Sequence, residues 1–275
     1  MDRLPFGIRQ LDTTIGGGAP PGSVVLLSGE PGAGAREFIY TSAVMNGLST
    51  SDPELFELYY GAELHEGPEV HYVSFTAEEQ QVTREISLTM DEEVVEAGLD
   101  DVTFHDLSPE YFRLSPVPRE WYAGRAATID DLGTTRNRQS VAEALGDVLT
   151  SHAADNLVVI DSLTDLITAS EEQIAWRDIT VLMKGLSQAA YQWGGLILAH
   201  VNKEALEETK HGQLADAADG TLLFEWESGG SSRVRTMVVK QFRGVLSRLE
   251  EDDVVRFETE IGDAGFDVSD VRKIR

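Results

Sequence analysis

Short apolar runs alternate along the chain with segments in which apolar residues recur at helical spacing. The runs predict strands at residues 24–27, 70–75, 102–105, 157–160 and 195–202. The helical spacing predicts helices at 35–48, 77–88, 140–152 and 174–193. From residue 220 the pattern changes to strands only, at 221–226, 234–242, 255–261 and 266–268. This order predicts an α/β fold with a mostly parallel central sheet, helices on both faces and a β-hairpin-rich C-terminal part.

Two segments interrupt the alternation. Residues 49–69 are polar, contain Pro and Gly around an apolar patch, and predict an inserted loop with a short helix. Residues 108–135 combine prolines with Trp121 and Tyr122 and predict a second irregular insertion. This second segment either packs against the core as a loop, or covers a site or binds a partner. We expect residues 1–275 to form a single domain that carries both insertions.

The charge is strongly one-sided. The chain has 48 Asp and Glu residues against 22 Lys and Arg, and its formal net charge is −26. Only five of the basic residues are Lys. Such a surface repels itself in dilute buffer and is screened in concentrated salt. This composition is typical of salt-accumulating microbes and predicts a halophilic source; the alternative is an acidic protein of an ordinary cytosol.

The sequence lacks the features of disulfide-bonded, membrane-spanning, metal-binding and nucleic-acid-binding proteins. There is no cysteine, which excludes disulfides and thiolate chemistry. No apolar run approaches the ~18 residues of a membrane span, and residues 1–5 lack a signal-peptide core, so we expect a cytoplasmic protein without membrane contact. The six histidines have no metal-binding spacing. No stripe of Lys and Arg is present, so binding to nucleic acid is not expected.

The most informative stretch follows the first strand. A strand, a Gly-rich loop and a helix form the context of the phosphate-binding P-loop, G-x-x-x-x-G-K-[ST]. Gly29 and Gly34 stand at the required spacing, but Ala35 replaces the Lys and Arg36 replaces the Ser or Thr. The sequence therefore predicts a degenerate nucleotide-binding loop formed by Gly29, Glu30, Pro31, Gly32, Ala33, Gly34, Ala35 and Arg36.

Together with the residues before it, this loop resembles the opening of RecA-superfamily ATPases of the KaiC, GvpD and RadA kind. The matching residues are Gly7, Leu11, Asp12, Gly17, Gly18, Pro20, Gly22, Gly29, Pro31, Gly32 and Gly34. The resemblance extends to about Phe266. It implies a RecA-like P-loop NTPase fold, ATP and Mg²⁺ as ligands, and assembly into homo-oligomers.

The resemblance also implies roles for residues at strand ends. Asp161 follows a wholly apolar strand at the position that holds magnesium, although such an Asp also caps turns. His200 and Asn202 are candidate sensors of the γ-phosphate; a structural role for His200 is the alternative. Arg243 matches the residue that reaches the ATP of a neighbouring subunit, or else it pairs with an acidic surface.

One departure from the family pattern concerns the attacking water. The family places a Glu-Glu pair directly after the second strand, whereas Glu78 and Glu79 come two residues late. Two residues turn a helix by roughly 200°, so we expect these side chains to point elsewhere, as acids of a first helical turn.

These departures predict that ATP hydrolysis is lost or very weak. We therefore expect a KaiC-like protein that binds nucleotide weakly or not at all and acts in regulation or signalling through itself or an unknown protein partner. One alternative is a working ATPase in which Arg36 replaces the Lys, with Arg243 supplied by a neighbouring subunit. A recombinase-like DNA-binding protein is a less favoured alternative, because phosphate neutralisation needs clustered Lys and Arg.

Overall fold

A computed structural model describes residues 3–61, 67–113, 115–122, 140–170, 175–229, 232–245 and 256–272. Its first six strands are β1 (Ser23–Gly29), β2 (Val70–Ser74), β3 (Val102–Asp106), β4 (Leu157–Asp161), β5 (Leu196–Asn202) and β6 (Gly220–Gly229). The last three are β7 (Ser232–Phe242), β8 (Arg256–Gly262) and β9 (Gly265–Arg272).

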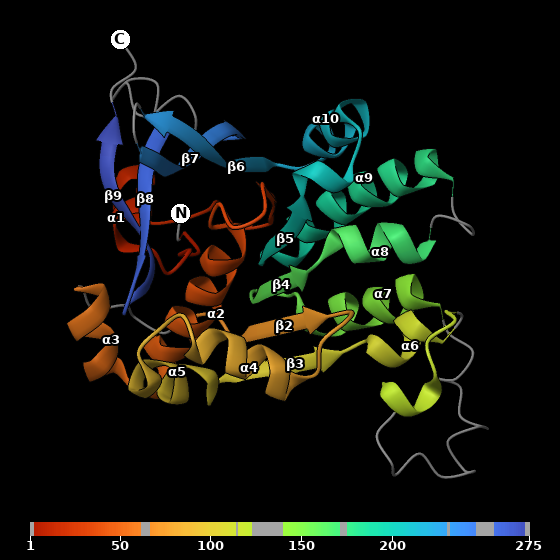
Figure 1. The fold of residues 1–275 in the computed structure, drawn as a ribbon, viewed down its shortest axis with the longest axis horizontal. Helices are drawn as coiled ribbons and strands as arrows, with labels where there is room; N and C mark the ends of the chain where they lie inside the picture. The colour runs from red at the N-terminus through yellow and green to blue at the C-terminus, as the bar shows by residue number, and fades with distance from the viewer. Residues whose placement is uncertain are drawn as a thin grey trace.

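All nine strands belong to one sheet, in the order β3-β2-β4-β5-β1-β6-β7-β8-β9 (Figure 1). Pairing is parallel from β3 through to β6. It is antiparallel from β6 to β9. The predicted fold class, a mostly parallel sheet followed by C-terminal hairpins, is confirmed.

Helices cover both faces of this sheet. One hydrophobic core contains side chains of α1 (Arg9–Ile15), α2 (Ala35–Ser51), α3 (Pro53–Tyr60), α4 (Glu79–Ser87) and α5 (Glu92–Leu99). The other is built with α6 (Ser108–Phe112), α7 (Val141–His152), α8 (Leu163–Ser170), α9 (Trp176–Trp193) and α10 (Glu208–Ala217). Figure 1 shows the two groups of helices on opposite sides of the parallel strands.

Strand β1 shows why the apolar runs are continuous. Val25 and Leu27 enter the core with α2, whereas Val24 and Leu26 enter the core with α9. Successive side chains of a strand point to opposite faces, so a strand covered on both faces needs apolar residues at every position. This arrangement places the carboxyl ends of β1 and β4 at one edge of the sheet, where the chain turns into α2 and α8.

The structure contains helices that the sequence pattern did not indicate. The Gly and Pro clusters of residues 6–23 predict a turn rather than a helix, but α1 lies within them, and α5, α8 and α10 were also not expected. The short helix expected in the first insertion is confirmed as α3, whose N-cap Asp52 accepts a hydrogen bond from the Leu55 N–H at 3.0 Å. Of the second insertion, α6 and a 3-10 turn at Arg119–Trp121 are described, and residues 123–135 lie outside the described part.

Three histidines from separate elements meet beside the edge strand β3. They are His71 on β2, His105 on β3 and His152 at the end of α7. Their ring centroids lie 5.3 Å (71–105), 4.6 Å (71–152) and 5.0 Å (105–152) apart. His71 Nδ1 and His105 Nε2 share a hydrogen bond of 3.1 Å. We call these three residues the histidine cluster.

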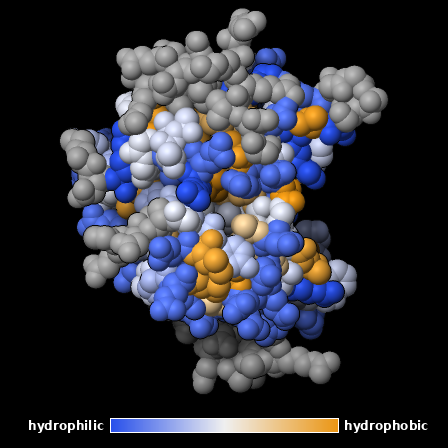
Figure 2. All heavy atoms as spheres, turned by 90° about the vertical axis from the view of Figure 1, so that its left-hand side faces the viewer, coloured by the Kyte–Doolittle hydropathy of each residue, from blue (hydrophilic) through white to orange (hydrophobic). Residues whose placement is uncertain are grey.

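The surface agrees with the acidic composition. Figure 2 shows mainly hydrophilic side chains on the face drawn, interrupted by small, separated apolar groups. Across the described residues, no helix is both long enough and apolar enough to cross a bilayer.

Candidate functional site

The P-loop backbone connects β1 to α2. Gly34 is the N-cap of α2 and has φ 110°, a left-handed value that glycine adopts without strain. The N–H groups of a first helical turn have no intrahelical acceptor, and Gly34 provides no side chain to cap them. A Cβ on Gly29 would lie 2.6 Å from the Cβ of Ala35, so the loop also needs glycine there. The result is an uncapped helix N-terminus, which favours an anion.

The β6–β7 hairpin holds the outer half of the loop. Trp226 Nε1 donates to the Pro31 carbonyl at 3.2 Å, and Arg235 Nε donates to the Gly32 carbonyl at 3.0 Å. The Trp226 N–H donates to Glu30 Oε2 at 3.3 Å. These contacts hold the Pro31 and Gly32 carbonyls and the Glu30 side chain against the hairpin, and no sequence signal indicated them.

Strand β9 supports the inner half. Phe266 lies so close to Gly34 that a Cβ there would be 2.9 Å from its ring. The ring is buried and makes edge-on contacts with Phe38 and Phe224, at centroid distances of 5.4 and 5.7 Å. The loop is therefore positioned by both C-terminal hairpins.

An open cleft of about 380 Å³ lies at the carboxyl ends of the strands, beside the loop. It is lined by Gly29, Glu30, Pro31, Gly32, Gly34, Ala35, Arg36, Glu37, Ser162, Thr164, Asp165, His200 and Asn202. The structure thus brings most of the predicted loop together with both sensor candidates. Arg243 is not among the lining residues; its Nη1 lies 3.0 Å from Asp219 Oδ1.

Asp161 is buried behind Arg36 at the end of β4, and hydrogen-bond donors contact both of its carboxylate oxygens. Tyr72 OH donates to Oδ2 at 2.8 Å, and His200 Nδ1 and Arg36 Nη2 lie 3.3 and 3.4 Å from Oδ1. Burial acts to raise the pKa of Asp161, but the His200 hydrogen bond and the Arg36 charge hold that pKa below its ordinary value. The carboxylate is therefore ionised and paired within the protein.

Arg36 lies at the mouth of the site, with its side chain 49% exposed. The charge of Asp161 raises the pKa of this guanidinium, and Tyr40, Tyr72 and Glu85 add to the effect against the opposing influence of burial. Tyr40 OH donates to Glu85 Oε2 at 2.8 Å, which places an acidic residue of α4 near the same cation. Position 36 thus carries a permanent positive charge near two carboxylates.

The sensor candidates have partners of their own. His200 contacts Asp161, as described above. Asn202 Oδ1 accepts the Glu204 N–H at 3.0 Å, and the Asn202 N–H donates to Thr164 Oγ1 at 2.9 Å. These bonds order the rim of the cleft between β5 and α8.

No carboxylate of the expected pair reaches the cleft in the described structure. Glu78 is the N-cap of α4, Glu79 lies in its first turn, and neither lines the cleft. Among the acids that do line it, Glu30 accepts from Trp226 and Asp165 accepts from Ser162 Oγ at 2.5 Å. Within the described residues, no group of three or more His, Asp or Glu side chains is arranged to hold a metal ion.

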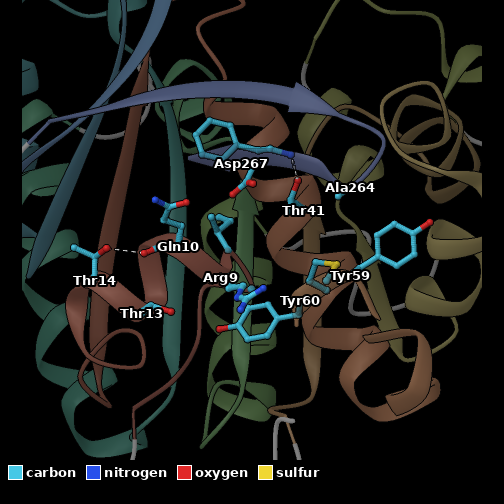
Figure 3. A pocket seen from close by; sticks show the side chains of 13 residues that line it. Arg9, Gln10, Thr13, Thr14, Thr41, Tyr59, Tyr60, Ala264 and Asp267 are labelled. Carbon is cyan, nitrogen blue, oxygen red and sulfur yellow. Dashed lines mark hydrogen bonds between the residues drawn. The ribbon is translucent and has the colours of Figure 1, made fainter. Parts of the chain in front are cut away.

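A larger hollow of about 560 Å³ lies along the other half of α2, between α1, α3 and β9. Figure 3 shows its polar lining, which includes Arg9, Gln10, Thr41, Tyr60 and Asp267. Thr41 Oγ1 accepts the Phe266 N–H at 2.7 Å in its wall. No residue of the P-loop lines it, so the motif and the larger hollow mark different places.

Comparison with known proteins identifies the fold. No protein-family model and no curated protein matches the sequence. Among solved structures, a KaiC-like protein of the hyperthermophilic archaeon Pyrococcus horikoshii OT3 superposes with a TM-score of 0.61. The match covers 98% of this chain and 99% of that chain, at 17% sequence identity. This chain has a KaiC-like fold. This fold agrees with the resemblance seen in the Gly-rich loop, the residues before it and Asp161.

Proposed function

We propose that this protein is a KaiC-like member of the RecA superfamily that binds a nucleotide in the P-loop cleft without hydrolysing it. It acts in regulation or signalling through protein partners, in the cytoplasm of a salt-accumulating cell. One observation carries the proposal: the anion-binding backbone is intact, whereas Arg36, in place of the hydroxyl residue, is paired with Asp161 at 3.4 Å.

The site lacks side chains that hydrolysis of ATP needs. Ala35 cannot stabilise charge between the β- and γ-phosphates as the P-loop Lys does. Loss of one preorganised donor typically costs ~10²–10³ in rate. No member of the Glu78–Glu79 pair lines the cleft to orient a water molecule. Binding uses the backbone, so it persists where catalysis does not.

The test is calorimetric titration with ATP in molar KCl, together with an assay of phosphate release. We expect binding by the unaltered protein and no release above background. Arg177→Ala is the matched control for Arg36→Ala, because Arg177 is an exposed arginine on α9, outside the cleft. Arg36→Ala should bind more weakly and the control should not change. Magnesium-dependent hydrolysis that Asp161→Ala abolishes would overturn the proposal.

The alternative ATPase, in which Arg36 replaces the Lys, is less well supported by the site. Hydrolysis needs, besides a cation on the terminal phosphates, a group that orients the attacking water, and neither Glu78 nor Glu79 lines the cleft. The phosphate-release assay separates the two. A DNA-binding function is disfavoured by the net charge of −26, and a gel-shift assay in molar KCl should show no shifted DNA.

Assembly into a ring is a further part of the family expectation. Arg243 is exposed and paired with Asp219 of its own chain, so a contact with a neighbour's nucleotide would have to replace that ion pair. Light scattering with and without ATP would show whether oligomers form. If Arg243 contacts the neighbouring nucleotide, Arg243→Ala should lower the ATP-dependent increase in mass.

A further inference from the structure

In a magnesium-binding P-loop protein, two side chains hold the metal ion: an Asp and a Ser or Thr. This chain keeps only the first of them. Asp161 is present, but position 36, where the family supplies a hydroxyl ligand, carries a guanidinium. Mg²⁺ requires about six oxygen ligands in near-octahedral geometry at about 2.0–2.1 Å. An arginine has donors only and cannot be a ligand.

The hydrogen-bond donors around Asp161 also disfavour a magnesium ion. Its Oδ1 has His200 Nδ1 at 3.3 Å and Arg36 Nη2 at 3.4 Å, and its Oδ2 accepts from Tyr72 at 2.8 Å. These three donors already take up most of the roughly four lone-pair sites of a carboxylate, so a magnesium ion on this carboxylate would compete with them. It would also lie beside the Arg36 cation, which like-charge repulsion disfavours. The residues present therefore do not fit Mg²⁺.

What they fit is a cation that is already part of the chain. Arg36 is paired with Asp161 at its inner side, it lines the cleft, and half of its side chain is exposed there. A guanidinium has five N–H donors in a planar fork that matches two phosphate oxygens. The contact with Asp161 uses one nitrogen, Nη2, so it does not use up the five donors of the fork.

We infer that Arg36 takes the place of Mg²⁺, so that the P-loop cleft binds nucleoside di- or triphosphates in their metal-free form. The inference rests on the proposed nucleotide binding and adds the charge state of the ligand. Arg36 supplies the positive charge between Asp161 and the phosphates that the metal ion supplies in a complete P-loop site. Among the described residues that line the cleft, Arg36 is the one Lys or Arg beside Glu30, Glu37 and Asp165, so it is the fixed positive charge that the phosphates of metal-free ATP would use.

The first test is ATP titration in molar KCl with either excess Mg²⁺ or excess EDTA. We expect the affinity in EDTA to equal or exceed that in Mg²⁺. Arg36→Ser, which introduces the hydroxyl and frees Asp161, should lose roughly 10- to 100-fold of the affinity in EDTA, in line with loss of a charge-assisted hydrogen bond. Its remaining affinity should depend on Mg²⁺. Arg177→Ser is the matched control and should behave as the unaltered protein. Binding by the unaltered protein that requires Mg²⁺ would overturn the inference.

A second test does not need the nucleotide. Mn²⁺ binding is followed by electron paramagnetic resonance in molar KCl, which screens weak binding to the acidic surface. The unaltered protein and Asp161→Asn should bind equally, whereas Arg36→Ser should gain one site that Arg36→Ser/Asp161→Asn lacks. Circular dichroism checks that each variant is folded.

The two tests separate the two proposals. If the unaltered protein binds no ATP in either buffer, the proposed function fails, and the Mn²⁺ experiment still decides the role of Arg36. An Mn²⁺ site in the unaltered protein that disappears in Asp161→Asn would show that Arg36 does not occupy the metal position.

Discussion

Acidification should destabilise this protein through the histidine cluster. Burial, together with the charge of His152, lowers the pKa of His71 from 6.5 to about 4. Burial and the neighbouring histidines lower the pKa of His105 to about 4 as well. The unfolded chain binds protons near pH 6.5 and the folded chain does not. The free energy of unfolding must therefore fall as the pH drops from 6.5 to about 4.

The structure sets the size of the effect. One pKa unit corresponds to ~1.4 kcal/mol, so the fall from 6.5 to about 4 amounts to at most ~3.5 kcal/mol for a fully buried histidine. His71 is buried, but His105 is only partly buried, and solvent screening reduces its contribution. Glu69 Oε2 lies 3.8 Å from His71 Nε2 but is 81% exposed and offsets little. We expect a combined loss of about 2–3 kcal/mol.

The assay is urea unfolding in molar KCl, followed by circular dichroism, at several pH values between 7 and 4. Other groups also titrate in this range, so the difference between the unaltered protein and His105→Gln is the informative quantity. Glutamine keeps a hydrogen-bonding group opposite His71 Nδ1 and removes one titrating ring. The variant should lose about 1 kcal/mol less on acidification. Equal losses in the two proteins would refute the reasoning.

Three further outcomes are expected. Gly29→Ala should destabilise the protein by about 1–3 kcal/mol in urea unfolding, because its Cβ would lie 2.6 Å from that of Ala35; no loss would mean that the loop relaxes freely. Phe266→Ala should lower the free energy of unfolding by about 3–5 kcal/mol, because the buried ring contacts Phe38 and Phe224. Urea unfolding measures this change as well. A decrease below about 1 kcal/mol, well under the usual range, would contradict the prediction. Raising KCl from about 0.1 M, where the Debye length is about 10 Å, to molar concentration should raise the melting temperature. The reason is that screening weakens repulsion within a chain of net charge −26. A lower melting temperature by calorimetry would count against this prediction.

The sequence predicted the elements whose signal is local. The apolar runs of β1, β4 and β5 are long enough to identify buried strands, and the spacing of Gly29 and Gly34 identifies the loop between β1 and α2. The helices that the pattern missed are short or carry no clear apolar face. For example, α10 includes Lys210, His211 and Gly212, and it packs mainly through His211, Leu214 and Ala215.

The contacts that decide the chemistry of the site are not local. Arg36 and Asp161 are 125 residues apart; the family resemblance assigns both positions to one site, but no local pattern shows that the two side chains pair. Trp226 reaches Pro31 across 195 residues. The histidine cluster likewise combines two strands and a helix, with spacings that match no metal motif. Such pairs become visible only when the strand order is known.

The position of β1 at the centre of the sheet also determines when the fold can form during protein synthesis. Among the nine strands described, β1 leaves the ribosome before the others, yet its two neighbours are β5 and β6. Its Val24 N–H is bonded to Asp219, 195 residues later in the chain. Contacts of such long sequence separation form slowly, and an unpaired apolar strand is prone to aggregation meanwhile. A nascent chain that ends before residue 196 therefore holds β1 with neither neighbour, and its apolar strand stays unpaired during that interval.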